Sequence, residues 1–257
     1  MNRETRVKLF RWSLSILVFL TLWEIIARAG IFISIVPASE TLPELVRLLG
    51  MESTETREEL VDATLGTMAL AGVGFVIGGV VGIGIGVWTA VSARAAAVLD
   101  PVISTSFSVP FIIFIPVMGL YLGLEFAAKI VLVLLLNVFV ITLNTSAGIK
   151  EVPADAKEMA RAFGVSGSGL YRKVVLPWAS PHIITGLRLG AGQSVQGAIL
   201  ADLFFRAQDL GLYIVNAQGR FDIPRLTAAV FFVTVLGAGV MGIARVIEWR
   251  ILRWKRV

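Results

Sequence analysis

The amino-acid sequence predicts an all-α protein that crosses a membrane several times. Of its 257 residues, 56% are hydrophobic and only 16% are charged, whereas soluble domains carry about 25% charged residues. The mean hydropathy is +0.84. The apolar residues also gather in runs that approach the roughly 20 residues a helix needs to cross a bilayer. We therefore expect an integral membrane protein.

Six membrane-spanning helices are expected, within a single domain that covers residues 1–257. The fifth span is complete only if it starts near Ile183 and places Arg188 close to one end, where a long side chain reaches the interface. Pro110 and Pro116 indicate that the third span is kinked or broken. The expected spans are residues 12–28, 64–91, 102–124, 129–149, 183–204 and 226–246.

The N-terminal segment allows two interpretations. Basic residues before an apolar run also describe a secretory signal, and Ala27-Arg28-Ala29 is similar to a small-x-small cleavage site. The apolar run is long for a signal core, however, and Trp23-Glu24 interrupts its end. We therefore expect an uncleaved first helix.

The lysines and arginines predict the orientation. With a cytoplasmic N-terminus and six spans, sixteen of them lie inside and seven outside, as the positive-inside rule requires. The outside set is Arg28, Arg47, Arg57, Lys129, Arg206, Arg220 and Arg225. Both termini are therefore expected in the cytoplasm. This topology also explains the net charge of +5, so no nucleic-acid partner is expected.

Polar residues within the expected spans are few and uncharged. Asn137 and Asn144 are seven residues apart and share a helix face, while Gln193, Ser194 and Gln196 cluster on the next span. An amide that faces lipid lacks hydrogen-bond partners. These five residues therefore either bond between helices or line a route through the membrane.

A stripe of glycines at steps of four marks the second span: Gly74, Gly78, Gly82 and Gly86. Such a stripe lets another backbone approach closely. It indicates either close packing within the chain or a surface that faces another subunit.

The sequence disfavours several functional classes. It has no cysteine, and its single histidine, His182, has no acidic residue nearby in the sequence. No lysine follows a glycine, so the Gly-x-x-x-x-Gly-Lys phosphate loop is missing. We expect no catalytic residue, cofactor or metal site on this chain. A secondary transporter typically has ionisable residues at mid-membrane, and the expected spans lack them apart from Glu24 and Arg188, which are placed at span ends.

A polar insert, residues 150–180, separates the fourth and fifth spans. Pro153 suits the first position of a helix and Gly164 suits its C-terminal cap. Ala156, Met159, Ala160 and Phe163 form an apolar side at helical spacing. This short cytoplasmic helix either rests on the protein's own spans or is presented to a soluble partner.

The same insert resembles the EAA loop of ABC importer permeases. Glu158-Met159-Ala160 is followed after three residues by Gly164, and after nine more by Val174-Val175-Leu176-Pro177. Met159 replaces an alanine and Val174 an isoleucine of the family pattern. The resemblance covers residues 37–254 and is to the nitrate/sulfonate/taurine branch. Departures are Ala201-Asp202, where that branch often has Ala-Glu, and Gly211-Leu212-Tyr213, where it has Gly-Leu-Gly.

The resemblance implies a fold like that of type I ABC importer permeases in a bacterial inner membrane. Two permease subunits, identical or related, would form the pathway, with a cytoplasmic ATPase dimer that holds ATP and magnesium and an extracytoplasmic substrate-binding protein. The solute would be small and anionic, such as nitrate, a sulfonate, taurine or bicarbonate; another small organic solute is the alternative. The coupling residues implied are Ala154, Asp155, Glu158, Ala160, Arg161, Gly164, Leu176 and Pro177.

Overall fold

A computed structural model of the chain describes residues 3–29, 36–49, 54–106, 109–205 and 209–253. Within these ranges the protein is helical and contains no strand. The elements are α1 (Arg3–Arg28), α2 (Ala38–Leu48), α3 (Thr54–Val91), α4 (Ala93–Ser106), the 3₁₀ turn η1 (Phe111–Phe114), α5 (Ile115–Leu122), α6 (Phe126–Lys150), α7 (Ala154–Ala162), α8 (Gly167–Leu170), the π-helical turn η2 (Tyr171–Val175), α9 (Leu176–Phe204), α10 (Asp209–Gly219) and α11 (Ile223–Ile251).

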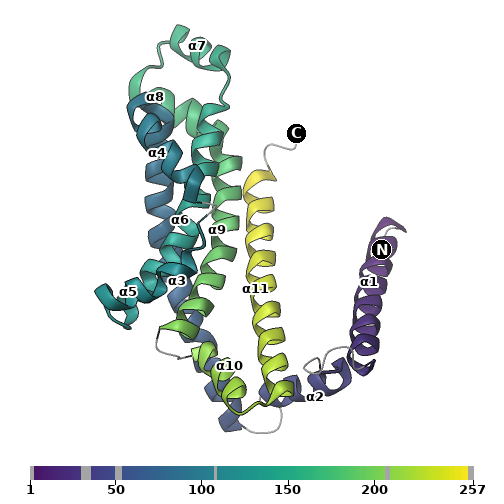
Figure 1. Cartoon of the computed structure of the whole chain (residues 1–257). Coiled ribbons are helices and arrows are strands. Elements are labelled where there is room, and N and C mark those ends of the chain that lie inside the picture. The colour runs from purple at the N-terminus through teal and green to yellow at the C-terminus, as the bar shows by residue number, and fades with distance from the viewer. Residues whose placement is uncertain (1–2, 30–35, 50–53, 107–108, 206–208, 254–257) are drawn as a thin grey trace.

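Three long helices, α3, α6 and α9, pack side by side and form the centre of the molecule (Figure 1). The glycine stripe of α3 lies against α6. A Cβ atom added at Gly82 would lie 2.9 Å from the Val138 carbonyl oxygen, and one added at Gly86 would lie 2.8 Å from that of Thr142. The stripe therefore serves close packing within the chain, which was the first of its two interpretations.

The central hydrophobic core joins α3, α5, α6 and α9. Its fully buried members include Leu132 and Val133 of α6 and Ala198 and Ala201 of α9. A second cluster, around Val175, lies near the junction of α6 with α7. Small side chains on α9 allow α6 to approach closely, so these helices form a rigid unit.

The expected third span, residues 102–124, is not one helix. Its residues belong to α4 and to the η1–α5 segment, whose directions differ by 95°. Pro110 stands directly before η1, and its fixed φ and missing N–H disfavour a continued helix. The prolines thus predicted the break correctly, and whether residues 102–124 form one broken span stays a prediction.

Several helices are apolar enough for a bilayer. Within the described residues, three meet the requirements of length and hydropathy by themselves: Glu58–Val91, Phe126–Lys150 and Ile223–Ile251. The bent pair of Ala93–Ser106 and Phe111–Leu122 would add a fourth if it counts as one span. The remaining expected spans fall on α1 and α9, and the six-span topology stays a prediction.

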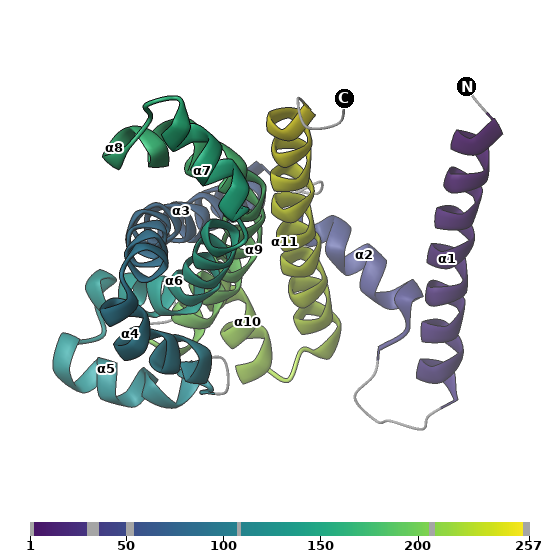
Figure 2. The ribbon, with the colours of Figure 1, turned by 90° about the horizontal axis from the view of Figure 1, so that it is seen from above.

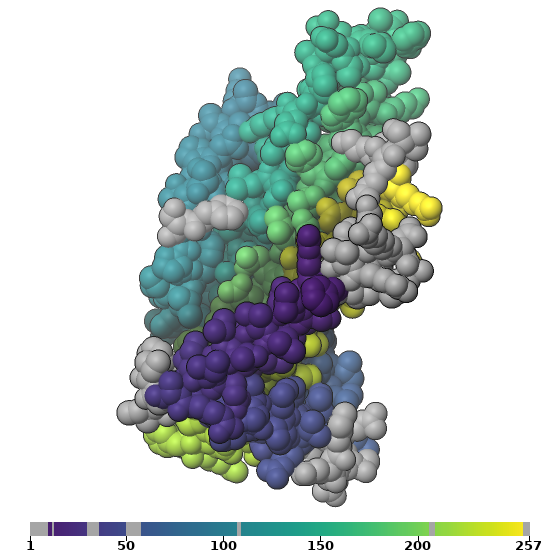
Figure 3. Space-filling view, turned by 90° about the vertical axis from the view of Figure 1, so that its right-hand side faces the viewer, coloured from purple at the N-terminus to yellow at the C-terminus, as the bar shows by residue number. Residues whose placement is uncertain are grey.

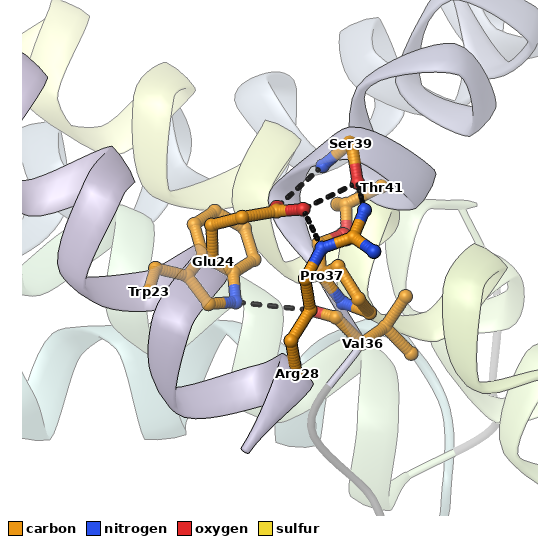
Figure 4. Close-up of polar contacts among 7 residues, drawn as sticks. All are labelled: Trp23, Glu24, Arg28, Val36, Pro37, Ser39 and Thr41. Carbon is orange, nitrogen blue, oxygen red and sulfur yellow. Dashed lines mark hydrogen bonds and ion pairs between the residues drawn. The ribbon is translucent and has the colours of Figure 1, made fainter. Parts of the chain in front are cut away.

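Helix α1 stands apart from the bundle and is joined to it through α2 (Figure 2). Glu24 accepts hydrogen bonds from Arg28 Nε at 2.6 Å, from Ser39 Oγ at 2.8 Å and from the Ser39 N–H at 3.1 Å. Trp23 Nε1 donates to the Val36 carbonyl oxygen at 3.0 Å (Figure 4). These contacts hold the end of α1 against the start of α2 and so set the angle between them.

The molecule has two distinct ends. The segment that carries α7 projects at one end, while α2 and α10 lie at the other (Figure 1, Figure 3). The first turn of α1 and the last turn of α11 are directed toward the α7 end. The expected placement of the insert and both termini on one side of the membrane stays a prediction.

Candidate functional site

The short helix α7 is closed at both ends by the residues that the sequence singled out. Pro153 occupies the N-cap, one residue before the helical position expected for it. At the other end Gly164 has φ = +80°. The Gly164 N–H donates to Arg161 O and the Val165 N–H to Ala160 O, both at 2.9 Å. This pair of bonds is a Schellman motif, and its positive φ explains the glycine.

The apolar side of α7 is divided between the protein and its surroundings. Ala160 packs against the buried cluster around Val175. Met159 is 63% exposed and Phe163 is 82% exposed. The small apolar residue of the helix thus rests on the protein, as the first alternative expected, while the two large ones are exposed.

The polar residues predicted for coupling surround these exposed side chains. Ala154, Asp155, Glu158 and Arg161 are all exposed on α7. Together with Met159 and Phe163 they form a projecting surface of mixed character, which we call the α7 surface. An exposed phenylalanine among charges suits contact with a protein partner, because aromatic residues dominate the buried centres of interfaces.

Leu176 and Pro177 lie where the insert enters α9, and both are exposed. The π-helical turn η2 precedes them directly. Pro177 has no N–H to donate to the preceding turn, and the helical hydrogen bonding changes spacing just before it. Pro177 therefore lies where the polar insert passes into the long helix α9.

The junction between α6 and α7 carries two contacts between polar side chains. Lys150 Nζ lies 2.9 Å from Asp100 Oδ2 on α4. His182 Nε2, on α9, lies 2.9 Å from Glu151 Oε2. The sequence showed no acidic residue near His182 along the chain. The neighbour is Glu151, which folding brings from 31 positions earlier in the chain.

Two of the five predicted pathway residues join helices to one another. Asn137 is completely buried, and its Nδ2 donates to Gly74 O at 3.1 Å and to Ser194 Oγ at 2.7 Å. Ser194 Oγ in turn donates to Gly190 O at 2.8 Å. Asn137 and Ser194 thus connect α3, α6 and α9, which is the interhelical alternative for these residues.

The other three predicted pathway residues have different surroundings. Asn144 donates to Val140 O of its own helix at 2.8 Å, and Gln196 is exposed. Gln193 lines a pocket of about 230 Å³ at the break between α4 and η1. The rings of Phe111 and Phe139, which also line this pocket, are stacked with centroids 5.5 Å apart.

Besides Glu24 and Arg188, the expected spans include two more charged residues near their ends, Lys129 and Asp202, which the sequence reasoning did not single out. Lys129 and Asp202 are buried on α6 and α9, and their Nζ and Oδ1 atoms lie 2.8 Å apart. Thr67 Oγ1 of α3 donates to the other Asp202 oxygen at 2.7 Å. The pair is compatible with the interior because each charge is neutralised and hydrogen-bonded. Lys129 thus lies in the first turn of α6, and the outer side that the orientation count gave it stays a prediction.

Arg188 also has a carboxylate partner. α9 begins at Leu176, seven residues before the expected start of the span at Ile183, and the position of Arg188 near one end of that span stays a prediction. Its Nε lies 2.9 Å from Glu248 Oε2 of α11 but makes no hydrogen bond, so the contact is an ion pair. Thr185 Oγ1 donates to the second Glu248 oxygen at 2.9 Å. Glu248 thus supplies a carboxylate partner for Arg188 that the sequence reasoning did not name.

Neither a metal nor a catalytic constellation emerges from the described residues. In this part of the chain no group of three or more His, Cys, Asp or Glu side chains is placed to hold a metal ion. The arrangement is suited to contact and packing. A helix projects at one end, buried polar residues hydrogen-bond between helices in the middle, and a small pocket lies beside a broken helix.

Comparisons with known proteins agree with this arrangement. The family described as "Binding-protein-dependent transport system inner membrane component" matches residues 82–253. A protein of Bacillus subtilis assigned as an aliphatic sulfonates transport permease is 27% identical over 96% of this chain and 90% of its own length. The formylaminopyrimidine transport permease of Halalkalibacterium halodurans is 26% identical over 95% of each chain. The bicarbonate transport system permease of Synechococcus elongatus is 26% identical over 93% of this chain and 86% of its own length.

The fold is also similar to that of a solved transporter subunit. A chain of the inward-facing MetNI methionine ABC transporter aligns with a TM-score of 0.65 and 21% sequence identity, and the alignment covers 77% of this chain and 99% of that one. This likeness concerns the fold alone. The family match covers most of the sequence, from the middle of α3 to the end of α11. The chain therefore belongs to the binding-protein-dependent transport system inner membrane components, the permeases of ABC importers.

Proposed function

We propose that this permease moves a small anionic solute into the cytoplasm and receives its driving force through α7. In this proposal α7 docks on a cytoplasmic ATPase subunit that binds ATP and magnesium. A substrate-binding protein delivers the solute at the opposite end of the molecule, where α2 and α10 lie. The permease itself performs no chemical reaction.

The observation that carries the proposal is the α7 surface. A helix of nine residues is too short to be stable alone in water, yet α7 is ordered by its Schellman cap and by the packing of Ala160. It nevertheless leaves Met159 and Phe163 uncovered. A protein partner that covers these two side chains and pairs with Glu158 and Arg161 would bury apolar area without leaving charges unpaired.

The translocation pathway is proposed along the face that carries Gln193. This amide reaches a pocket bounded by α6, α9 and the break after α4. A neutral amide can replace part of a solute's hydration shell without holding the solute as firmly as a fixed charge would. Asn144 and Gln196 remain candidates for the same route, while Asn137 and Ser194 support it by holding the helices together.

The anionic solute is proposed from the relatives. The permeases of Bacillus subtilis and Synechococcus elongatus carry names that refer to sulfonates and bicarbonate, which are both small oxyanions. The formylaminopyrimidine permease favours the alternative, another small organic solute. Both alternatives place the same demands on the permease, because the substrate-binding protein makes the first selection.

The assembly and orientation are part of the proposal. Two permease subunits, either two copies of this chain or this chain and a related one, would enclose the pathway in a bacterial inner membrane with six spans each. Both termini and α7 would lie in the cytoplasm. A reporter inserted at Lys157 should then behave as cytoplasmic, and a periplasmic signal there would contradict the orientation.

The docking proposal can be tested with a pair of matched substitutions. Phe163→Asp introduces a charge on the α7 surface, and Phe221→Asp does so on a phenylalanine that is 85% exposed between α10 and α11. Both variants should insert in the membrane. We expect only Phe163→Asp to lose co-purification of a co-expressed ATPase subunit. Normal co-purification with Phe163→Asp, or an equal loss with both variants, would overturn the docking role of α7.

A further inference from the structure

Helix α7 is connected to the bundle at a short junction where two neighbouring residues contact two different helices. α6 ends at Lys150, and α7 begins four residues later. Lys150 Nζ lies 2.9 Å from Asp100 Oδ2 of α4. Glu151 Oε2 lies 2.9 Å from His182 Nε2 of α9. A displacement of α7 therefore acts on α4 and on α9 through adjacent positions of the chain.

The contact with α9 is part of a tightly packed crossing. A Cβ atom added at Gly148 would lie 2.5 Å from His182 Cβ and 3.1 Å from the Ala179 carbonyl oxygen. The backbones of α6 and α9 thus approach as closely as glycine permits. These two helices have little freedom to move relative to each other at this end, so α9 follows α6 whether or not Glu151 bonds to His182.

The contact with α4 is of a different kind. An open groove of about 820 Å³ separates α4 from α6, lined largely by small side chains such as Ala97 and Ala147. Asp100 and Lys150 both line this groove, and their ion pair joins the two helices across it. Packing alone therefore couples α4 to α6 weakly, and the ion pair supplies a direct connection.

We propose that the Asp100–Lys150 ion pair transmits the movement of α7 to α4. This inference rests on the docking function proposed above for α7. α4 ends at Ser106, which lines the same pocket as Gln193. A displacement of Asp100 thus moves α4, and with it the part of the proposed pathway that Ser106 lines. Asp100 and Lys150 are positioning residues in this role and do not contact the solute.

The exposure of the pair separates this role from a purely structural one. The Lys150 and Asp100 side chains are 44% and 43% exposed, whereas those of Lys129 and Asp202 are 5% and 0% exposed. An ion pair in contact with water contributes little to stability. Loss of the Asp100–Lys150 pair should therefore change the coupling between ATP hydrolysis and uptake, while the complex still assembles.

The test uses the assembled transporter in proteoliposomes and measures ATP hydrolysed per solute imported. We expect Asp100→Asn and Lys150→Met to raise this ratio about fivefold or more, the lower end of typical couplings between sites, at an unchanged yield of complex. The exchanged variant D100K/K150D should return the ratio of ATP hydrolysed to solute imported toward the wild-type value. Arg94→Gln should leave this ratio unchanged. It removes a charge from α4 that forms no ion pair with the described residues.

A second measurement uses the absence of cysteine from the sequence. Joining the two positions of D100C/K150C with a short bifunctional reagent replaces the ion pair by a covalent bond, so uptake should continue after cross-linking. Loss of uptake on cross-linking would overturn the inference. So would wild-type ratios in both single variants, or an exchanged variant as defective as they are. Failure of the proposed function itself would appear in the wild-type complex, as uptake that does not depend on ATP.

Discussion

The buried Lys129–Asp202 ion pair gives the sharpest prediction for stability. Asp202 is fully buried, and both of its oxygens are engaged, one by Lys129 Nζ at 2.8 Å and the other by Thr67 Oγ1 at 2.7 Å. Replacing it in Asp202→Asn would leave the Lys129 charge buried without its carboxylate. Removing one partner of a buried pair costs about 3–5 kcal/mol. This is a large fraction of the stability of a typical protein.

The effect can be measured as the unfolding temperature of the purified permease in detergent. At about 2–4 °C per kcal/mol for a chain of this size, Asp202→Asn and Lys129→Met should each lower the midpoint by about 6–20 °C. The double variant K129M/D202L removes both charges, so it should recover much of this loss. Lys150→Met is the matched control, because its pair is half-exposed and worth about 0–1 kcal/mol.

Two results would refute this reasoning. Single variants that lose no more than Lys150→Met would show that the buried environment does not penalise the loss of one charge of the pair. A double variant as unstable as the singles would show that the loss comes from packing around α6 and α9 rather than from the charges. The comparison is valid at one scan rate only, since membrane proteins often unfold irreversibly.

Three further predictions concern the cap, the pathway and pH. Gly164→Trp should abolish uptake and co-purification of the ATPase while the permease still inserts, because a tryptophan is strained at φ = +80°. Gly164→Asn should retain more uptake and more co-purification, because asparagine tolerates that backbone region better. Equal activity of the two variants would contradict the role of the cap. Gln193→Leu should reduce uptake in an intact complex, whereas Asn137→Leu should reduce the yield of complex, and the reverse pattern would place the pathway elsewhere. Burial raises the pKa of Asp209 above its ordinary value of 3.8, so its contribution to stability is full below that pH and is lost as the pH rises through the folded-state pKa. Asp209→Asn should therefore raise the unfolding temperature relative to wild type near pH 7 but not near pH 3.5, and a pH-independent difference would show that its pKa is not shifted.

The sequence predicted the local features well because they depend on nearby residues. Pro153 and Gly164 delimit a helix by backbone geometry alone, and α7 ends within two residues of the expected positions. The glycine stripe on α3 predicted a close approach, and Pro110 predicted a break in the third span. Each of these signals acts through its own backbone or through its helix face.

The features that sequence reasoning missed depend on contacts between distant residues. Lys129 and Asp202 are 73 positions apart, and no local pattern shows that two charges will neutralise each other in the interior. The same holds for Arg188, whose partner Glu248 lies on α11. The sequence did contain a weak indication of the buried pair. Asp202 lay inside the expected span 183–204, and a charge within a span usually has a charged or polar partner.

The division of the α7 apolar side had a different cause. Helical periodicity places Met159 and Phe163 on the same side as Ala160, but it does not show how wide a stripe the bundle can cover. The bundle covers the small residue and leaves the large ones exposed. The exposed part of the α7 surface thus follows from the tertiary placement of α7, which one sequence does not define.

The most direct test of the central claim is uptake by the reconstituted complex. Proteoliposomes that contain the permease, its ATPase subunit and enclosed ATP, with the substrate-binding protein added outside, should accumulate a labelled small anion such as bicarbonate or an aliphatic sulfonate. Uptake should stop without ATP and should fall to that background when the permease carries Phe163→Asp. Uptake that persists without ATP and instead follows a proton or sodium gradient would contradict the account.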